Sequence, residues 1–119
     1  MTIDLRGTWT LVELDDASPA AGPRGPVHLT FDGDGQVYGM AGVNSVRGTW
    51  TLEDGRLQLG PLVSTLLAGE PEPMATEQAL VALLREPLQV TVDEDRLRLA
   101  ADDGSTALLA RADPSVVLV

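Results

Sequence analysis

Apolar and polar residues alternate with a period of two along most of the chain. Val27, Leu29 and Phe31, for example, are separated by single polar residues. Such spacing places the apolar side chains on one face of a β-strand and the polar side chains on the other. The alternation recurs between turns and predicts strands at residues 7–13, 27–31, 36–41, 47–53, 56–60, 87–92, 96–100 and 106–111.

Short acidic turns separate the predicted strands. Asp and Gly cluster there, as at residues 32–35, 54–55 and 103–104. Asp hydrogen-bonds to its own backbone and Gly accepts a positive φ, so both residue types favour hairpins. We therefore expect a mainly β (α+β) fold, with about eight short strands in a strongly curled or barrel-like antiparallel sheet.

Residues 74–84 break this alternation and predict a single α-helix. The segment contains no Gly or Pro, and Leu80, Leu83 and Leu84 recur at the spacing of one helical face. Pro73 precedes the segment at a position that the first turn of a helix tolerates, and another proline follows the segment. We expect this helix of about three turns to pack on the sheet.

A hexapeptide occurs twice in the chain. Residues 6–11, Arg-Gly-Thr-Trp-Thr-Leu, recur letter for letter as residues 47–52. In a strand, Trp and Leu of this sequence share one face, so Trp9 and Trp50 are predicted to be the largest buried side chains. The alternative is that both tryptophans line a ligand cavity.

Composition limits the functions that this chain can perform. Its 119 residues are typical of one domain and no long linker divides them, so residues 1–119 are predicted to form a single domain. The formal net charge of −10 disfavours binding to nucleic acid, because the phosphate backbone is also negative. The lack of Cys excludes disulfides, thiolate zinc sites and a cysteine nucleophile.

No pattern typical of an active site is recognisable in the sequence. His28 is the only histidine, and the alternation places it on the solvent face without a second base for a catalytic triad. Residues 32–35 begin like a calcium loop but lack the later Gly and Glu that such loops require. The acidic pairs lie at turns, where no apolar setting would raise a pKa for acid–base catalysis. We therefore predict no enzymatic activity, no catalytic residue, no metal site and no cofactor.

The start of the chain and its hydropathy bear on location. Residues 1–6 include an early acid and no apolar core of a signal peptide, and there is no lipid-anchor motif. No stretch approaches the roughly 18 apolar residues that a membrane helix needs. The sequence thus predicts a cytoplasmic protein without a membrane span.

Residues 112–119 form an apolar tail that finishes with Val-Val-Leu-Val. Exposed apolar residues at a terminus are unfavourable in water and readily pair with other strands. We expect the tail to add an edge strand or to pack on a partner, which is compatible with a monomer or a weak homodimer.

Residues 39–44, Gly-Met-Ala-Gly-Val-Asn, predict a structural corner at the end of a strand. Glycines at these spacings permit a bulge or a close backbone approach, and Asn44 can bond neighbouring amides. The order of this corner and the other motifs resembles the META domain family, that of the bacterial HslJ-like heat-shock proteins. The resemblance covers about residues 5–111 and gives a structural role to the family-motif residues Gly7, Trp9, Gly39, Gly42, Asn44, Gly48, Trp50 and Thr65.

The resemblance also implies two cysteine positions, which are occupied here by Val43 and Gly69. In the family these cysteines are thought to pair. Their joint loss is expected where a reducing compartment makes the bond dispensable. Many relatives are exported or lipid-anchored, whereas this chain shows neither signal.

The family resemblance implies no enzymatic activity and no established ligand. Our leading hypothesis is a non-catalytic META-like domain of unknown molecular function, which acts as a stress-related or protein-interaction module with a protein partner yet to be identified. The alternative is a small apolar-ligand-binding barrel of the lipocalin or fatty-acid-binding type, because a Gly-x-Trp motif also opens those families. Trp9 and Trp50 would then line the cavity.

Overall fold

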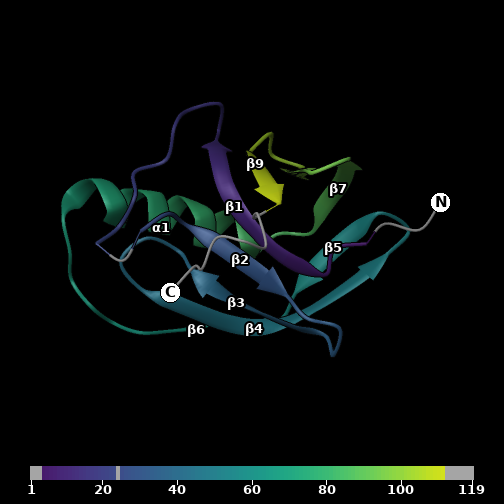
Figure 1. Cartoon of the computed structure of the whole chain (residues 1–119), viewed down its shortest axis with the longest axis horizontal. Coiled ribbons are helices and arrows are strands. Elements are labelled where there is room, and N and C mark those ends of the chain that lie inside the picture. Colours follow the sequence, from purple (N-terminus) through teal and green to yellow (C-terminus); the bar gives the residue numbers. More distant parts are fainter. Residues whose placement is uncertain (1–3, 24, 112–119) are drawn as a thin grey trace.

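Eight antiparallel strands close into a barrel in the computed structural model, which describes residues 4–23 and 25–111 (Figure 1). Each strand pairs with its neighbours along the chain, and the last strand pairs with the first. The predicted mainly β fold is confirmed, and each predicted strand agrees with the structure to within two residues at either end. The strands are β1 (Gly7–Leu14), β2 (His28–Phe31), β3 (Gln36–Met40), β4 (Ser45–Glu53), β5 (Arg56–Leu59), β7 (Leu88–Asp93), β8 (Arg96–Ala101) and β9 (Thr106–Arg111).

A ninth strand, β6 (Val63–Ser64), was not predicted from the sequence. It follows β5 after an interruption at Gly60 and Pro61 and pairs with the first half of β4. Two residues are too few to show an alternating pattern, which is why the sequence gives no sign of this strand. Among the described residues, no strand other than β4 pairs with β6. The edge strand expected in residues 112–119 lies outside the described residues.

One helix, α1 (Pro71–Leu84), lies across an end of the barrel. It contacts the loop after β1 and the turn between β3 and β4, and its side chains Leu80, Leu83 and Leu84 are buried in the core. The helix begins three residues earlier than predicted, at Pro71 instead of Met74. Proline is favoured there because the first N–H groups of a helix have no partner within the helix. No helix within residues 4–23 and 25–111 has the length and apolar character needed to cross a bilayer.

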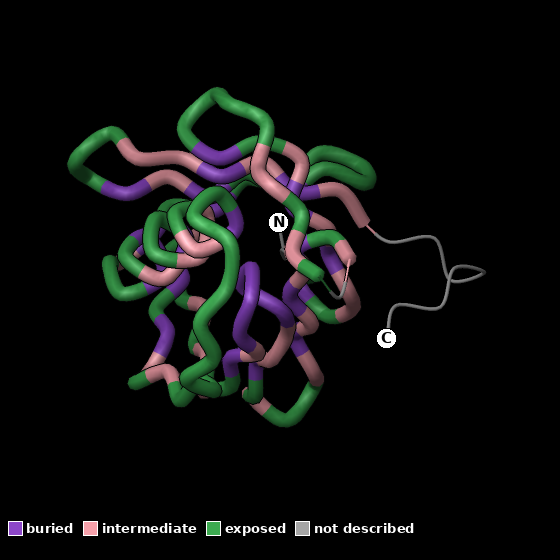
Figure 2. Tube along the Cα trace, turned by 90° about the vertical axis from the view of Figure 1, so that its left-hand side faces the viewer, coloured by how far each residue is buried: buried purple, intermediate pink, exposed green. Residues whose placement is uncertain are grey.

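Side chains fill the interior of the barrel. An internal cavity large enough for water would leave accessible surface on the side chains around it. Trp9, Leu57 and Leu97 are each 0% exposed, so no such cavity adjoins them. Figure 2 shows the exposed stretches mainly at the outer bends of the trace. The core is therefore a packed mixture of Leu and Val around one Trp and one Phe, as its members show.

The first copy of the repeated hexapeptide places Trp9 fully within this core. Its indole N–H donates a hydrogen bond to the Leu5 carbonyl oxygen at 2.9 Å. The Arg111 guanidinium lies 4.1 Å from the centre of the Trp9 ring and donates a hydrogen bond to the Arg6 carbonyl oxygen. Trp9 is thus covered by the segment that precedes β1 and by the end of β9.

The second copy is less buried than we predicted. Trp50 is only half-buried and packs edge-on against Phe31, with ring centres 5.6 Å apart. The pairing of β4 with β3 ends at Thr49, opposite Gln36, so Trp50 lies where β4 and β5 project beyond their neighbour. Tertiary surroundings, not the local sequence, make the two tryptophans different.

Candidate functional site

Asn44 lies at the turn between β3 and β4. Among the described residues it is the one polar residue that is buried, with 3% exposure. Its Oδ1 accepts hydrogen bonds from the Thr65 hydroxyl (2.8 Å) and from the Leu67 N–H (2.6 Å). Its Nδ2 donates to the Leu67 carbonyl oxygen (3.0 Å) and to Glu77 Oε2 (2.9 Å). The amide therefore uses both of its donors and both acceptor positions, which is the full capacity of an Asn side chain.

Glu77 of α1 completes this arrangement from the helix side. Its Oε1 accepts hydrogen bonds from the backbone N–H groups of Val43 (3.0 Å) and Asn44 (2.6 Å). Asn44, Thr65, Leu67 and Glu77 are called the Asn44 cluster below. The cluster ties together three parts of the chain that are distant in sequence: the β3–β4 turn, the segment after β6, and α1.

Two glycines of the predicted corner allow these parts to approach one another. A Cβ on Gly39 would overlap the main chain of His28 on the neighbouring strand. A Cβ on Gly42 would lie 2.5 Å from the Pro73 carbonyl oxygen and 2.9 Å from Glu77 Cβ. The close contacts of β3 with β2 and of the turn with α1 therefore require glycine.

The structure brings together some of the predicted motif residues and separates others. Gly42, Asn44 and Thr65 lie in or beside the Asn44 cluster, and Gly39 lies on β3 just before it. The remaining motif residues lie on β1 or β4, outside the cluster: Gly7, Trp9, Gly48 and Trp50.

Val43 and Gly69, at the two expected cysteine positions, are in direct contact. A Cβ built on Gly69 would lie 3.3 Å from Val43 Cβ, close to the Cβ separation of about 3.5–4.5 Å in disulfides. It would also lie 2.5 Å from Val43 Cγ2. The Val43 side chain thus occupies the space that a disulfide would take, and the absence of a side chain at Gly69 provides that space.

The double substitution V43C/G69C is expected to form a disulfide and to stabilise the fold. Closing a loop of about 27 residues removes unfolded-state entropy equivalent to about 3.5 kcal/mol. The measurement is urea denaturation of the same double variant, oxidised and reduced, so that the reduced protein controls for lost Val43 packing. Failure of the two thiols to bond, or equal urea midpoints for the two forms, would contradict this geometry.

Three large apolar side chains are exposed in β6 and in the segment that follows it. Val63 is 73% exposed, Leu66 94% and Leu67 50%. Single exposed apolar residues are ordinary, but three within five positions form a patch. Residues 60–69 also contain no charged residue, although the chain carries 26 charged residues in total. We call residues 63–67 the display segment. The Asn44 side chain hydrogen-bonds to both the N–H and the C=O of Leu67, the last residue of this segment.

A shallow groove of about 370 Å³ runs beside the display segment on the outer face of the barrel. Tyr38, Arg47 and Val63 line it, and the Arg47 guanidinium lies 5.3 Å from the centre of the Tyr38 ring. His28 also lines the groove, and its Nδ1 lies 3.2 Å from the Pro26 carbonyl oxygen. The imidazole therefore belongs to the outer surface of β2, on the side that the sequence predicts.

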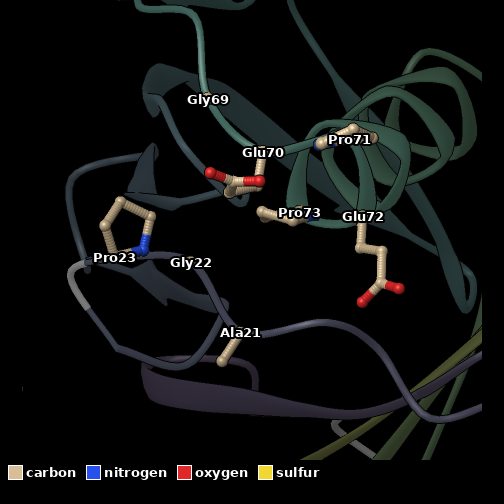
Figure 3. A pocket seen from close by; sticks show the side chains of 8 residues that line it. All are labelled: Ala21, Gly22, Pro23, Gly69, Glu70, Pro71, Glu72 and Pro73. Carbon is tan, nitrogen blue, oxygen red and sulfur yellow. The ribbon is translucent and has the colours of Figure 1, made fainter.

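A second cavity, of about 760 Å³, lies between the loop after β1 and the start of α1 (Figure 3). Figure 3 shows Pro23 on the loop side and Glu70, Pro73 and Glu72 on the helix side. The carboxylates of Glu70 and Glu72 are both exposed to solvent. The cavity is lined by Ala21, Gly22, Pro23, Gly69, Glu70, Pro71, Glu72 and Pro73.

Two exposed carboxyl groups, one near the start of the chain and one at a turn, have lowered pKa values. The Arg6 side chain donates a hydrogen bond to Asp4 at 3.1 Å and lowers the pKa of that carboxyl group. The Ser105 backbone N–H, 2.9 Å from Asp103 Oδ1, lowers the pKa of Asp103. Within residues 4–23 and 25–111, no three His, Asp or Glu side chains gather as metal ligands would. None of these groups takes part in the Asn44 cluster.

Sequence reasoning did not identify Glu77 and Leu66 as site residues. Glu77 lies within the predicted helix, and its role depends on a turn 33 residues earlier in the chain. Leu66 lies in a segment with neither helical nor strand periodicity. The lack of charged residues at positions 60–69, together with the lack of either period, is the one sequence signal that could have indicated this patch.

Comparison with known proteins places these features in a family. The family model described as META domain matches residues 2–114. The chain is similar in structure to a protein from Burkholderia xenovorans solved by NMR, with a TM-score of 0.72, 26% sequence identity, and coverage of 91% of this chain and 83% of that chain. It is also similar in fold to a DUF4847 family protein from Bacteroides vulgatus, with a TM-score of 0.65, 16% identity, and coverage of 92% and 96% respectively. No curated protein sequence matches the chain.

Proposed function

The chain belongs to the META domain family, and on that premise we propose that it is a non-catalytic module that binds a partner protein through the display segment. The observation that carries this proposal is the exposure of Val63 and Leu66 on a segment whose backbone is fixed by Asn44. An apolar patch that is held in place is typical of a binding surface, since water disfavours it in the free protein.

The local backbone favours a partner that binds as an extended strand. The outer edge of β6 pairs with no other strand of the described residues, so its N–H and C=O groups are available to an added strand. Edge strands that must stay free usually carry charges, whereas residues 60–69 carry none.

The packed interior favours this hypothesis over an apolar-ligand barrel. A ligand in the interior would have to displace Trp9, Leu57 or Leu97, each 0% exposed. A thermal-shift screen with fatty acids separates the two hypotheses, because a ligand at about 100 times its Kd stabilises a protein by about 2.7 kcal/mol. We expect no such shift, and a reproducible one would favour the ligand-binding barrel.

Hexapeptides of alternating Val and Thr, uncharged apart from a fluorescein label, are expected to bind the protein, and substitution of the display segment should weaken this binding. In the double variant V63E/L66E, two carboxylates replace exposed apolar groups, so the peptide affinity should fall at least about tenfold. Fluorescence anisotropy titration is the measurement.

The matched control for this titration is Q58E/T91E, which adds the same two charges at exposed positions of β5 and β7. The peptide affinity of this control should stay within about twofold of the wild-type value, because its substitutions change the net charge of the protein but leave the display segment unchanged. Equal losses in the two double variants would show that charge repulsion, not the display segment, governs binding. That result, or no binding by the wild-type protein, would overturn the proposed function.

A further inference from the structure

We propose that the groove beside the display segment binds a small organic carboxylate with an apolar body, through the guanidinium of Arg47. This inference goes beyond the proposed function and does not rest on it, since it involves no strand addition. Three observations support it: the residues that line the groove, the surroundings of Arg47, and a difference between the two copies of the repeated hexapeptide.

Strand register builds the groove from two rows of residues on the outer face of the barrel. The strands β2, β3, β4 and β6 lie side by side in that order (Figure 1). In the first row, Arg47 is paired with Tyr38 on one side and with Val63 on the other. Paired residues point to the same face of a sheet, so each row forms a continuous strip of lining. The second row consists of His28, Met40 and Ser45.

The groove carries a positive charge in an acidic protein. The chain has 18 Asp and Glu residues against 8 Lys and Arg, yet among the described residues Arg47 lines the groove and no Asp or Glu does. Salt screens charges that lie more than about 8 Å apart at physiological ionic strength. The local guanidinium, not the net charge of −10, therefore governs which ions the groove accepts.

The Arg47 guanidinium is held in position without a carboxylate partner. It lies 5.3 Å from the centre of the Tyr38 ring, in a cation–π contact that restricts the side chain. Within residues 4–23 and 25–111, no ion pair joins it to a carboxylate. A guanidinium presents its N–H donors in a planar fork that matches the two oxygens of a carboxylate. A ligand carboxylate can thus bind it with little further loss of side-chain freedom.

The two copies of the hexapeptide differ in what neutralises their arginine. In the first copy, the Arg6 side chain donates a hydrogen bond at 3.1 Å to Asp4, which lies two residues before it. In the second copy the corresponding position is Ser45, which has no charge. Identical local sequences therefore carry one neutralised arginine and one without a carboxylate partner among the described residues. This difference favours an external carboxylate as the partner of Arg47.

The ligand needs an apolar body because an ion pair that is exposed to water contributes little affinity by itself. Val63 is 73% exposed and is paired with Arg47 across β4 and β6. A ligand whose carboxylate reaches Arg47 can therefore cover Val63 as well, and removal of that apolar surface from water adds affinity. The groove thus favours an aromatic or aliphatic monocarboxylate over a bare anion.

NMR titration of the full chain with 3-phenylpropionate tests this inference. The backbone amide signals of Tyr38, Arg47 and Val63 should shift saturably as the probe is added. Two further compounds separate charge from apolar contact: 3-phenylpropionamide keeps the body without the charge, and inorganic phosphate keeps a charge without the body. Both should bind at least about tenfold more weakly than 3-phenylpropionate.

Two variants, each with a matched control, locate the binding. R47Q should weaken 3-phenylpropionate binding at least about tenfold, whereas R98Q removes an exposed arginine of β8 and should change the affinity less than about twofold. S45D should weaken binding as R47Q does, because it gives Arg47 the neighbouring carboxylate that Asp4 gives Arg6. T91D adds the same charge on β7 and should have little effect.

Several results would overturn this inference. Equal affinity for 3-phenylpropionamide would show that Arg47 plays no part, and equal affinity for phosphate would show a site without apolar contact. Equal losses in R47Q and R98Q would assign binding to net charge. A wild-type chain whose amide signals do not shift saturably would also overturn it, and the proposed function would still stand, because strand addition to β6 does not use Arg47.

Discussion

Replacement of Asn44 with Ala is expected to lower the free energy of unfolding by about 3 kcal/mol. The substitution removes four hydrogen bonds and leaves the N–H and C=O of Leu67 and the Thr65 hydroxyl without a side-chain partner. Part of the loss is offset because Leu67 is half-exposed and water can reach it. Urea denaturation monitored by Trp fluorescence measures the change.

Thr65 supplies a graded control for this prediction. T65A removes one of the four hydrogen bonds and also the exposed one that the Thr65 hydroxyl accepts from the Ser45 N–H, so it is expected to cost about 1 kcal/mol, whereas T65S keeps the hydroxyl and should be nearly neutral. N44A should also weaken hexapeptide binding, because the display segment loses its anchor. A cost for N44A no larger than that of T65A would contradict the assignment of Asn44 as the centre of the cluster.

The second large effect is expected at the repeated hexapeptide. W9A should cost about 4 kcal/mol, because it opens a large void in the core and removes the ring beneath Arg111. W50A should cost about 2 kcal/mol, since Trp50 is half-buried and loses its contact with Phe31 and the hydrogen bond from its indole N–H to the Asp32 carbonyl oxygen. The two substitutions lie in identical local sequences, so each is a control for the other.

The same urea denaturation experiment measures both tryptophan variants. W9F refines the comparison, because it keeps an aromatic ring while removing the N–H that bonds the Leu5 carbonyl oxygen, at a cost of about 1–2 kcal/mol. Equal costs for W9A and W50A would contradict the structural difference between the two copies.

Features governed by local sequence could be predicted, and features governed by distant contacts could not. The strands of the barrel follow from period-two alternation and from Asp and Gly turns, both of which are local. The start of α1 was misplaced because two prolines, Pro71 and Pro73, both fit the first turn of a helix. β6 escaped prediction because its pairing with β4 depends on the interruption at Gly60 and Pro61, not on a pattern of its own.

The candidate site shows the same division. The glycines and Asn44 indicated a corner, since these residue types have restricted structural uses. The bonding partners of Asn44 lie 21 to 33 residues further along the chain, and no sequence pattern connects them to it. The different burial of Trp9 and Trp50 likewise depends on where the neighbouring strand β3 begins.

The central claim is that Asn44 fixes the backbone of an exposed apolar segment so that a partner can bind it. Residue-resolved amide hydrogen exchange at Leu67 tests this claim most directly, because its N–H donates to Asn44 Oδ1 at 2.6 Å. We predict that the Leu67 amide exchanges slowly in the wild-type protein and loses its protection in N44A, while core amides such as that of Leu97 stay protected. Exchange of the wild-type Leu67 amide at the rate of an unstructured peptide would contradict the claim.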